Sequence, residues 1–323
     1  MRLSTVVSTL ALALAATFAH AADFSLNVST SQVADDPMYK GLLEFKKNVE
    51  ARTKGRIAVK TFPAGQLGSD EDVIEQIRAG AGVALITDGA RMEPYVKEFG
   101  IITAPYIVNN FEEMRKFTLT PTFNEWCDKL SKKAGFRVFS FNWYQGERNV
   151  VTNKLVKTPA DLAGVRMRTP GAPIWIETTR ALGATPTPMP WSEAYSALSM
   201  KAIDAVEVQY PSLWGSRIYE VTKFVGKTRH IQLVTGLIGA SVWFDKLPKD
   251  LQQVVMEESL KAGDYASKLT KEQTVQVEKD IQTKGMTVTE LDLAPFKANM
   301  QAVYDKFGYN ELRKQVTAAI QAK

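Results

Sequence analysis

Residues 164–191, GVRMRTPGAPIWIETTRALGATPTPMPW, carry the pattern that most constrains the fold of this chain. At the start of this stretch, apolar residues alternate with Arg166 and Arg168, which predicts a short strand with both arginines on one face. Residues 169–173, TPGAP, then force a turn, and the last proline suits the first position of a helix over 174–182. The pattern therefore predicts a strand, a tight turn and a helix in immediate succession.

Arg168 stands at the end of the predicted strand, beside the turn and close to the start of the helix. A planar guanidinium held in such a place can bind a carboxylate through two hydrogen bonds. The alternative is an arginine on the surface that pairs with an acidic residue of the same chain. The strand and the turn alone leave both interpretations open.

Three motifs around Arg168 belong together: RMRTPGAP at 166–173, ALGATPTPMPWSEAYSAL at 181–198 and IDAVE at 203–207. Their order and spacing resemble those of the solute-binding proteins of tripartite ATP-independent periplasmic (TRAP) transporters, the DctP-like family. The resemblance implies that Arg168 binds the ligand carboxylate, with Pro170 in the expected place of the turn. The sequence departs from some relatives at Gly171, where they carry a ligand-binding asparagine.

Two further charged segments match this family. A predicted buried strand at 83–86 leads into TDGAR, and the resemblance implies that Asp88 accepts hydrogen bonds from ligand hydroxyl or amino groups while Arg91 supports the pocket. Asp88 is equally suited to cap the helix that follows it. In the run YQGER, the resemblance implies that Arg148 helps to bind the carboxylate.

Two more residues, both in predicted loops, are expected to contact the ligand. Trp191 matches an aromatic position that packs on the ligand in relatives, and packing in the core is the alternative. Ser31, in the polar loop 31–36 after the first predicted strand, is included as a ligand-binding residue.

The segment 208–214 is expected to set the choice of ligand. Val208 stands where many relatives have asparagine, so the polar contact is either absent or moved to Gln209. Tyr210 and Trp214, together with Trp191, add aromatic surface. The predicted ligand is a carboxylate with a compact, partly apolar body rather than a nine-carbon sugar acid. A C4 dicarboxylate is the alternative, with Arg148 or Arg91 binding its second carboxylate.

The first 21 residues have the pattern of a secretory signal peptide. Arg2 gives a short positive region, residues 6–18 are almost continuously apolar, and Ala19-His20-Ala21 matches an A-x-A cleavage site. We expect cleavage after Ala21 and export to the periplasm; an uncleaved anchor is the alternative. No cysteine lies near this site, which excludes a lipoprotein anchor.

The fold class predicted for the rest is α/β, with two lobes and the ligand cleft between them. A strand, a helix and a strand over 24–62 open the chain, and roughly 300 residues exceed what one core usually holds. The resemblance implies chain crossings near 145 and 233, a hinge there, and a long helix within 247–283 that spans both lobes. Lobe I is predicted to comprise 22–145 and 234–273, and lobe II 146–233 and 274–323.

Several kinds of chemistry are excluded or disfavoured by composition. After the leader there is one histidine, His230, and one cysteine, Cys127, so a histidine or cysteine metal site is excluded and a catalytic triad is improbable. The net charge of +5 is spread along the chain without a basic block, which argues against nucleic acid as a partner. We expect no enzyme activity, no metal and no cofactor.

The expected function is capture of a small organic acid and its delivery to the small and large integral-membrane subunits of a TRAP transporter, by a monomer. One alternative is a binding protein for a sensor or an ATP-driven importer, which neighbouring genes would discriminate. The other is a periplasmic lyase or hydrolase built from carboxylates, which turnover of a bound ligand would reveal.

Overall fold

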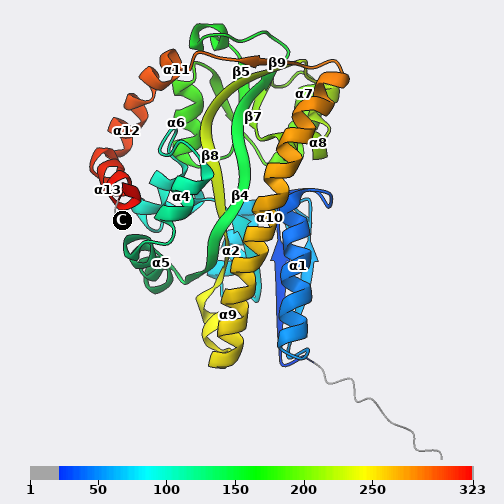
Figure 1. Ribbon diagram of the computed structural model, residues 1–323, viewed down its shortest axis with the longest axis vertical. Coiled ribbons are helices and arrows are strands. Elements are labelled where there is room, and N and C mark those ends of the chain that lie inside the picture. Colours follow the sequence, from blue (N-terminus) through cyan, green and yellow to red (C-terminus); the bar gives the residue numbers. More distant parts are fainter. Residues whose placement is uncertain (1–21, 322–323) are drawn as a thin grey trace, which may run out of the picture.

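The computed structural model describes residues 22–321. The predicted signal peptide and its cleavage site lie outside these residues. The described chain forms two lobes, one above the other in Figure 1, and a single nine-stranded sheet runs through both. The α/β, two-lobe fold predicted from the sequence is confirmed.

Two long strands join the lobes. β4 (Phe136–Thr152) and β8 (Phe224–Ala240) pair antiparallel along their length, with Gly146 opposite Leu233. The pairing register shifts at four places, and Gly146 has a left-handed φ of +118°, which glycine adopts without strain. The bulges bend the ribbon that passes from one lobe to the other.

The first lobe, at the bottom of Figure 1, is built on one end of this ribbon. Its part of the sheet has the order β2-β1-β3-β8, in which β1, β2 and β3 are parallel. The strands are β1 (Phe24–Ser29), β2 (Ile57–Phe62) and β3 (Val83–Thr87). The helices are α1 (Pro37–Arg52), α2 (Asp70–Arg78), α3 (Gly89–Met92), η1 (Lys97–Thr103), α4 (Phe111–Phe117), α5 (Pro121–Ala134) and α9 (Ser241–Asp245).

The second lobe continues the sheet in the order β4-β7-β5-β6, and β9 pairs with β8. Its strands are β5 (Arg166–Thr169), β6 (Thr185–Pro188), β7 (Ala205–Val208) and β9 (Thr287–Glu290). Its helices include η2 (Pro159–Leu162), α6 (Pro173–Ala181), η3 (Trp191–Glu193), α7 (Ala194–Ser199), α8 (Tyr210–Gly215) and η4 (Ile218–Glu220). As predicted, a strand, a turn and a helix that begins at Pro173 follow one another around Arg168.

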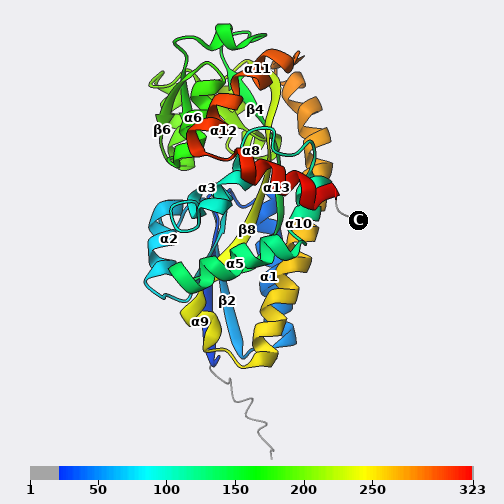
Figure 2. The ribbon, with the colours of Figure 1, turned by 90° about the vertical axis from the view of Figure 1, so that its left-hand side faces the viewer.

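One helix of 35 residues, α10 (Lys249–Thr283), runs along both lobes, as predicted (Figure 1). It packs on β4, on α1 of the first lobe and on α8 of the second. Small residues allow this close approach, because a Cβ at Gly263 would lie 2.3 Å from Asn142 Oδ1 and one at Gly41 2.6 Å from the Trp143 ring. The helix thus connects the two lobes, and Figure 2 shows that it lies on the side of the molecule opposite to β6.

The C-terminal helices α11 (Ala294–Asn299), α12 (Gln301–Phe307) and α13 (Asn310–Gln321) follow β9. In Figure 2 they descend from the upper lobe toward the lower one. α12 packs against α6, whereas α13 packs against α4 and η1 of the first lobe. The lobe boundaries given in the sequence analysis stay a prediction. They assign α13 to lobe II, whereas its contacts are with helices of the first lobe.

Two segments show how local residues set the bounds of the elements. Residues 111–134 form two helices, α4 and α5, because Thr120 caps the second one, which begins at Pro121. Residues 97–103 form the 3₁₀ helix η1, which ends at Thr103 before Pro105.

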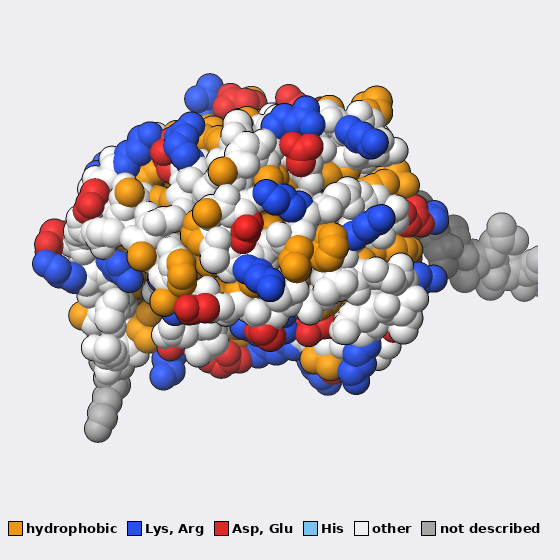
Figure 3. Space-filling model, turned by 90° about the horizontal axis from the view of Figure 1, so that it is seen from above, with side chains coloured by type: hydrophobic (Ala, Val, Ile, Leu, Met, Phe, Trp, Pro, Cys, Tyr) orange, Lys and Arg blue, Asp and Glu red, His pale blue; other side chains and the backbone are white. Residues whose placement is uncertain are grey.

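The surface agrees with the dispersed charge of the sequence. Figure 3 shows basic and acidic side chains interspersed with apolar ones on the face seen from above. Among residues 22–321, no helix combines the length and the apolarity needed to cross a bilayer.

Candidate functional site

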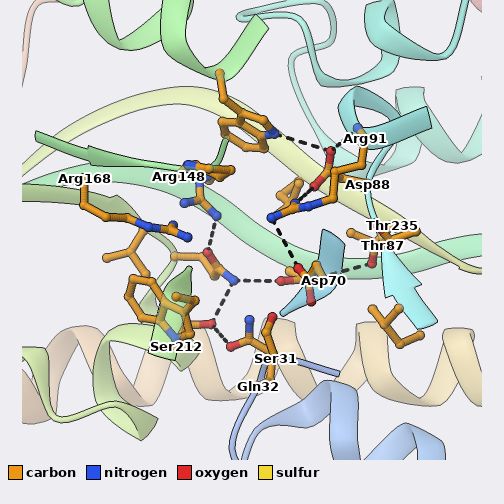
Figure 4. A pocket seen from close by; sticks show the side chains of 18 residues that line it. Ser31, Gln32, Asp70, Thr87, Asp88, Arg91, Arg148, Arg168, Ser212 and Thr235 are labelled. Atoms are coloured by element: carbon orange, nitrogen blue, oxygen red, sulfur yellow. Dashed lines mark hydrogen bonds and ion pairs between the residues drawn. The ribbon is translucent and has the colours of Figure 1, made fainter. Parts of the chain in front are cut away.

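A cavity lined by residues of both lobes lies between them. The carboxyl ends of β1 and β3 face it from the first lobe, and β5 and β7 face it from the second, which is where ligands bind in α/β sheets. Most of its lining is polar. The lining residues, shown in Figure 4, are Ser31, Gln32, Asp70, Ile86, Thr87, Asp88, Arg91, Gln145, Arg148, Arg168, Pro170, Trp175, Trp191, Val208, Gln209, Ser212, Leu233 and Thr235.

Arg168 is a buried cation without a partner acid. The residue is 3% exposed, its Nε donates to the Met189 carbonyl at 3.0 Å, and its guanidinium lies 5.2 Å from the centre of the Trp191 ring. It forms no ion pair with any acidic residue among 22–321. Burial lowers the pKa of Arg168 to about 9, and the nearby Arg148 also lowers it, while Glu207 opposes the shift. An anion in the cavity would supply the missing counter-charge.

Arg148 is buried as well, but its charge is already balanced. Its Nε and one terminal nitrogen form a two-point contact with the Glu207 carboxylate, and its other terminal nitrogen donates to Gln209 Oε1 at 2.9 Å. The guanidinium stacks on Trp175, 4.7 Å from the ring centre. Burial would raise the pKa of Glu207, but the charge of Arg148 and hydrogen bonds from His230 and Arg148 lower it overall. β4 and β7 are paired here, which brings the two residues together.

The third arginine of the cavity, Arg91, is surrounded by acids. It pairs with Asp88, with Glu71 at 3.0 Å and with Asp70 at 3.3 Å. Burial opposes its charge, but the three carboxylates raise the pKa of Arg91 above its ordinary value. Asp88 also accepts a hydrogen bond from the Arg91 backbone N–H and so caps α3, which is one of the two roles predicted for it. It additionally accepts the Trp175 indole N–H at 3.3 Å from the other lobe.

A chain of polar side chains crosses the floor of the cavity (Figure 4). Gln209 donates to Gln145 Oε1 at 2.9 Å and to Ser212 Oγ at 2.8 Å, and Gln145 donates to Thr235 at 3.3 Å. Ser212 in turn donates to Gln32 of the first lobe at 2.5 Å. The amides and hydroxyls are thus held in place by one another, which suits them to orient the groups of a polar ligand.

The structure brings seven of the nine predicted site residues to the cavity: Ser31, Asp88, Arg91, Arg148, Arg168, Trp191 and Gln209. It does not bring Tyr210 or Trp214. Tyr210 begins α8 and is buried in the core of the second lobe, and Trp214 stacks on Tyr219 with ring centres 4.8 Å apart. α8 begins directly after Gln209, with Pro211 in its first turn, and neither aromatic side chain of this helix lines the cavity.

Several lining residues were not predicted, most clearly Gln32, Asp70, Gln145, Trp175 and Ser212. Three of them stand close in sequence to a predicted residue: Gln32 next to Ser31, Gln145 three residues before Arg148, and Ser212 three after Gln209. Trp175 lies in the first turn of α6, and Asp70 is the first residue of α2 after the cap Ser69. The carboxyl ends of strands and the first turns of helices face the cavity, and this rule points to all of them except Gln145, which lies within β4.

Solved structures with the same fold were compared with this chain. A TRAP periplasmic solute-binding protein of Escherichia fergusonii, in an apo open form, is 43% identical, with a TM-score of 0.81 over 92% of this chain and 99% of the other. One from Ochrobacterium anthropi with bound L-fuconate is 30% identical, with a TM-score of 0.89 over 93% and 100%. One from Roseobacter denitrificans with bound L-galactonate is 27% identical, with a TM-score of 0.87 over 93% and 99%.

The two ligand-bound relatives superpose better than the open one although their identity is lower. The family model of the bacterial extracellular solute-binding proteins of family 7, DctP, matches residues 28–311. This chain therefore belongs to the DctP family and is a TRAP-type solute-binding protein.

Proposed function

We propose that this protein binds a small organic acid in the cleft between its lobes and delivers it to the integral-membrane subunits of a TRAP transporter. The observation that carries the choice of an acid is Arg168, a buried guanidinium that lacks a carboxylate partner in the described chain. Such a group favours binding of an anion, because the anion restores the electrostatic balance lost on burial.

In this proposal, Arg168 binds the ligand carboxylate through two hydrogen bonds while Trp191 packs beside it. Arg148 donates to Gln209 from one terminal nitrogen, and the second N–H of that nitrogen is available to the same end of the ligand. At the other end, Asp88, Arg91 and Ser31 contact ligand hydroxyl groups. Tyr210 and Trp214 have no place in this set.

The proposed ligand is a sugar acid or a similar hydroxylated acid. The partly apolar body expected from the sequence depended on Val208 and on three aromatic side chains, and of these Tyr210 and Trp214 do not line the cavity. The lining instead offers three glutamine amides and several hydroxyls, which match a ligand rich in hydroxyl groups. L-Fuconate and L-galactonate, the ligands of the two relatives above, are acids of this kind.

The remaining parts of the proposal concern the protein as a whole. Residues 1–21 act as a signal peptide cleaved after Ala21, and the mature protein works in the periplasm as a monomer. Lobes divided near 145 and 233 close over the ligand about the β4–β8 ribbon. The membrane partners are a small and a large subunit. The family consists of binding proteins, and we propose that this member performs no catalysis.

Identification of the ligand tests the proposal. Protein purified from the periplasm is denatured, and the released small molecules are identified by mass spectrometry. A thermal-shift screen then compares aldonates, uronates, C4 dicarboxylates and sialic acid, because a ligand that binds only the folded state raises the melting temperature. Stabilisation by no carboxylate, or conversion of a bound acid over hours, would overturn the proposal.

A further inference from the structure

The three arginines of the cavity differ in how their charges are balanced. Arg148 is paired with Glu207, and Arg91 with three carboxylates. Arg168 has no acidic partner among residues 22–321. The cavity thus holds one free positive charge, at its second-lobe side.

On the first-lobe side of the cavity, acidic side chains outnumber basic ones. One guanidinium, that of Arg91, is shared by Asp88, Asp70 and Glu71. Asp88 makes the close contact and also caps α3, whereas Asp70 touches Arg91 only at 3.3 Å and has no further hydrogen bond to a side chain in the described residues. The Asp70 side chain is 13% exposed and lines the cavity; the Glu71 side chain is 52% exposed and does not.

Asp70 and Arg168 stand in different lobes and face the same cavity (Figure 4). Each is close enough to influence the other's charge: burial raises the pKa of Asp70, and Arg168 is one of the cations that oppose this shift. A ligand that spans the cavity therefore meets an uncompensated cation at one end and an acidic side chain in excess at the other.

We infer that the cleft selects by charge, admitting acids with one carboxylate and disfavouring those with a second carboxylate at the far end, and that Asp70 is the residue that makes this distinction. The inference rests on the proposed function. A carboxylate on Arg168 leaves the far end of the ligand beside Asp70, which accepts hydrogen bonds and cannot donate them when ionised. Hydroxyl groups meet that requirement, and a second carboxylate brings like charges together.

The alternative in which Arg91 or Arg148 binds a second carboxylate conflicts with the contacts of both residues. Arg148 would have to give up Glu207, which is buried and would lose its counter-charge. Arg91 would have to accept a fourth carboxylate beside the three it already contacts. Neither arginine has both terminal nitrogens available to a ligand, as Arg168 has.

A pair of acids with the same carbon skeleton tests the inference. L-Galactonate has one carboxylate, and galactarate differs from it only by oxidation of the terminal hydroxymethyl group to a second carboxylate. Calorimetry on the wild type should show binding of galactonate that is tighter than that of galactarate by on the order of 30-fold or more. D-Gluconate with glucarate, and butyrate with succinate, serve as further pairs if the galactose series binds weakly.

Asp70→Asn removes the charge and keeps the shape of the side chain, so it should reduce the preference for the monoacid by roughly tenfold. Glu71→Gln is the matched control: it removes the same charge from the next residue in the first turn of α2, but the site is half exposed and outside the cavity, so it should change the preference by no more than about threefold. Thermal unfolding of both variants checks that they are folded.

The outcomes separate this inference from the proposed function. A wild type that binds the diacid as tightly as the monoacid, or an equal effect of both substitutions, overturns the role of Asp70 while leaving capture of an organic acid intact. A wild type that binds none of these acids and none in the wider screen overturns the proposed function itself.

Discussion

Ser212 Oγ lies 2.5 Å from Gln32 Oε1, and this hydrogen bond joins α8 of the second lobe to the loop after β1 of the first. The two residues are 180 positions apart and meet beside the ligand cavity. Together with the bond from Trp175 to Asp88 at 3.3 Å, it holds the lobes against each other on either side of the cavity. Contacts of this kind exist only while the lobes are closed.

Loss of the contact between Ser212 and Gln32 should weaken ligand binding without removing it. A buried neutral hydrogen bond contributes about 1 kcal/mol, so Ser212→Ala and Gln32→Ala should each reduce affinity for L-galactonate by roughly fivefold in calorimetry. The double substitution should cost little more than either single one, because both act on the same bond. Losses that simply add would show that the two residues act independently.

Closure itself predicts a change of shape in solution. The ligand should favour the closed arrangement because only there do both lobes contact it. The radius of gyration from small-angle scattering should therefore fall when L-galactonate is added to saturation. An unchanged radius would count against a hinge at the β4–β8 ribbon.

Some of the site could be predicted from sequence because the deciding features are local. The alternation around Arg168, the prolines of the turn and the start of α6 lie within a dozen residues, and the structure has them in the predicted order.

Other features depend on contacts between distant segments. The sequence gives no sign that Glu207 neutralises Arg148, because this follows from the pairing of β4 with β7, 59 residues apart. Tyr210 and Trp214 are predicted to contact the ligand because they belong to the segment 208–214 at the end of a strand. This segment forms α8 from Tyr210 onward, and tertiary packing decides whether the apolar side of the helix faces the core or the cleft.

The pair formed by Arg148 and Glu207 should matter for stability as well as for binding. Glu207→Gln would leave a buried guanidinium without its counter-charge, which typically destabilises a protein by about 3–5 kcal/mol. Urea unfolding measures this loss. The comparison is Asp204→Asn, which breaks the exposed ion pair with Arg166 and should cost less than about 1 kcal/mol. Equal losses would show that burial of the Arg148 pair has no special effect.

Asp36 should make stability depend on pH. This carboxyl caps α1 and is buried next to Ser212, and burial raises its pKa from 3.8 to about 6, against hydrogen bonds from the Met38 amide and Ser212. Between pH 6 and pH 4 the folded protein binds a proton more readily than the unfolded chain, so this residue contributes more stability as the pH falls and less as it rises.

Asp36→Asn keeps a capping side chain but removes this titration. Relative to the wild type, the variant should gain up to about 3 kcal/mol in free energy of unfolding between pH 4 and pH 7, as the wild type loses its bound proton. Urea unfolding at several pH values gives the difference. Curves for the two proteins that stay parallel from pH 4 to pH 7 would contradict the assignment.

Arg168 carries the most direct prediction about binding. Its guanidinium is buried, held by the Met189 carbonyl and Trp191, and open toward the cavity. Truncating one partner of a desolvated charge pair typically costs about 2–5 kcal/mol, so Arg168→Ala should weaken L-galactonate binding by on the order of 30- to several-thousand-fold. Arg168→Lys keeps the charge but loses the two-donor fork, and should fall between the wild type and the alanine variant.

Arg166→Ala is the matched control for Arg168. It lies two residues earlier on β5, where its side chain is exposed and pairs with Asp204 at 2.8 Å. Loss of the Arg166 side chain should change the affinity by no more than about twofold, because an exposed ion pair that does not line the cavity contributes little. Circular dichroism confirms that each variant is folded before calorimetry. If folded Arg168→Ala binds the acid as tightly as the wild type does, the carboxylate is bound elsewhere, and the lack of an acidic partner at Arg168 needs another explanation.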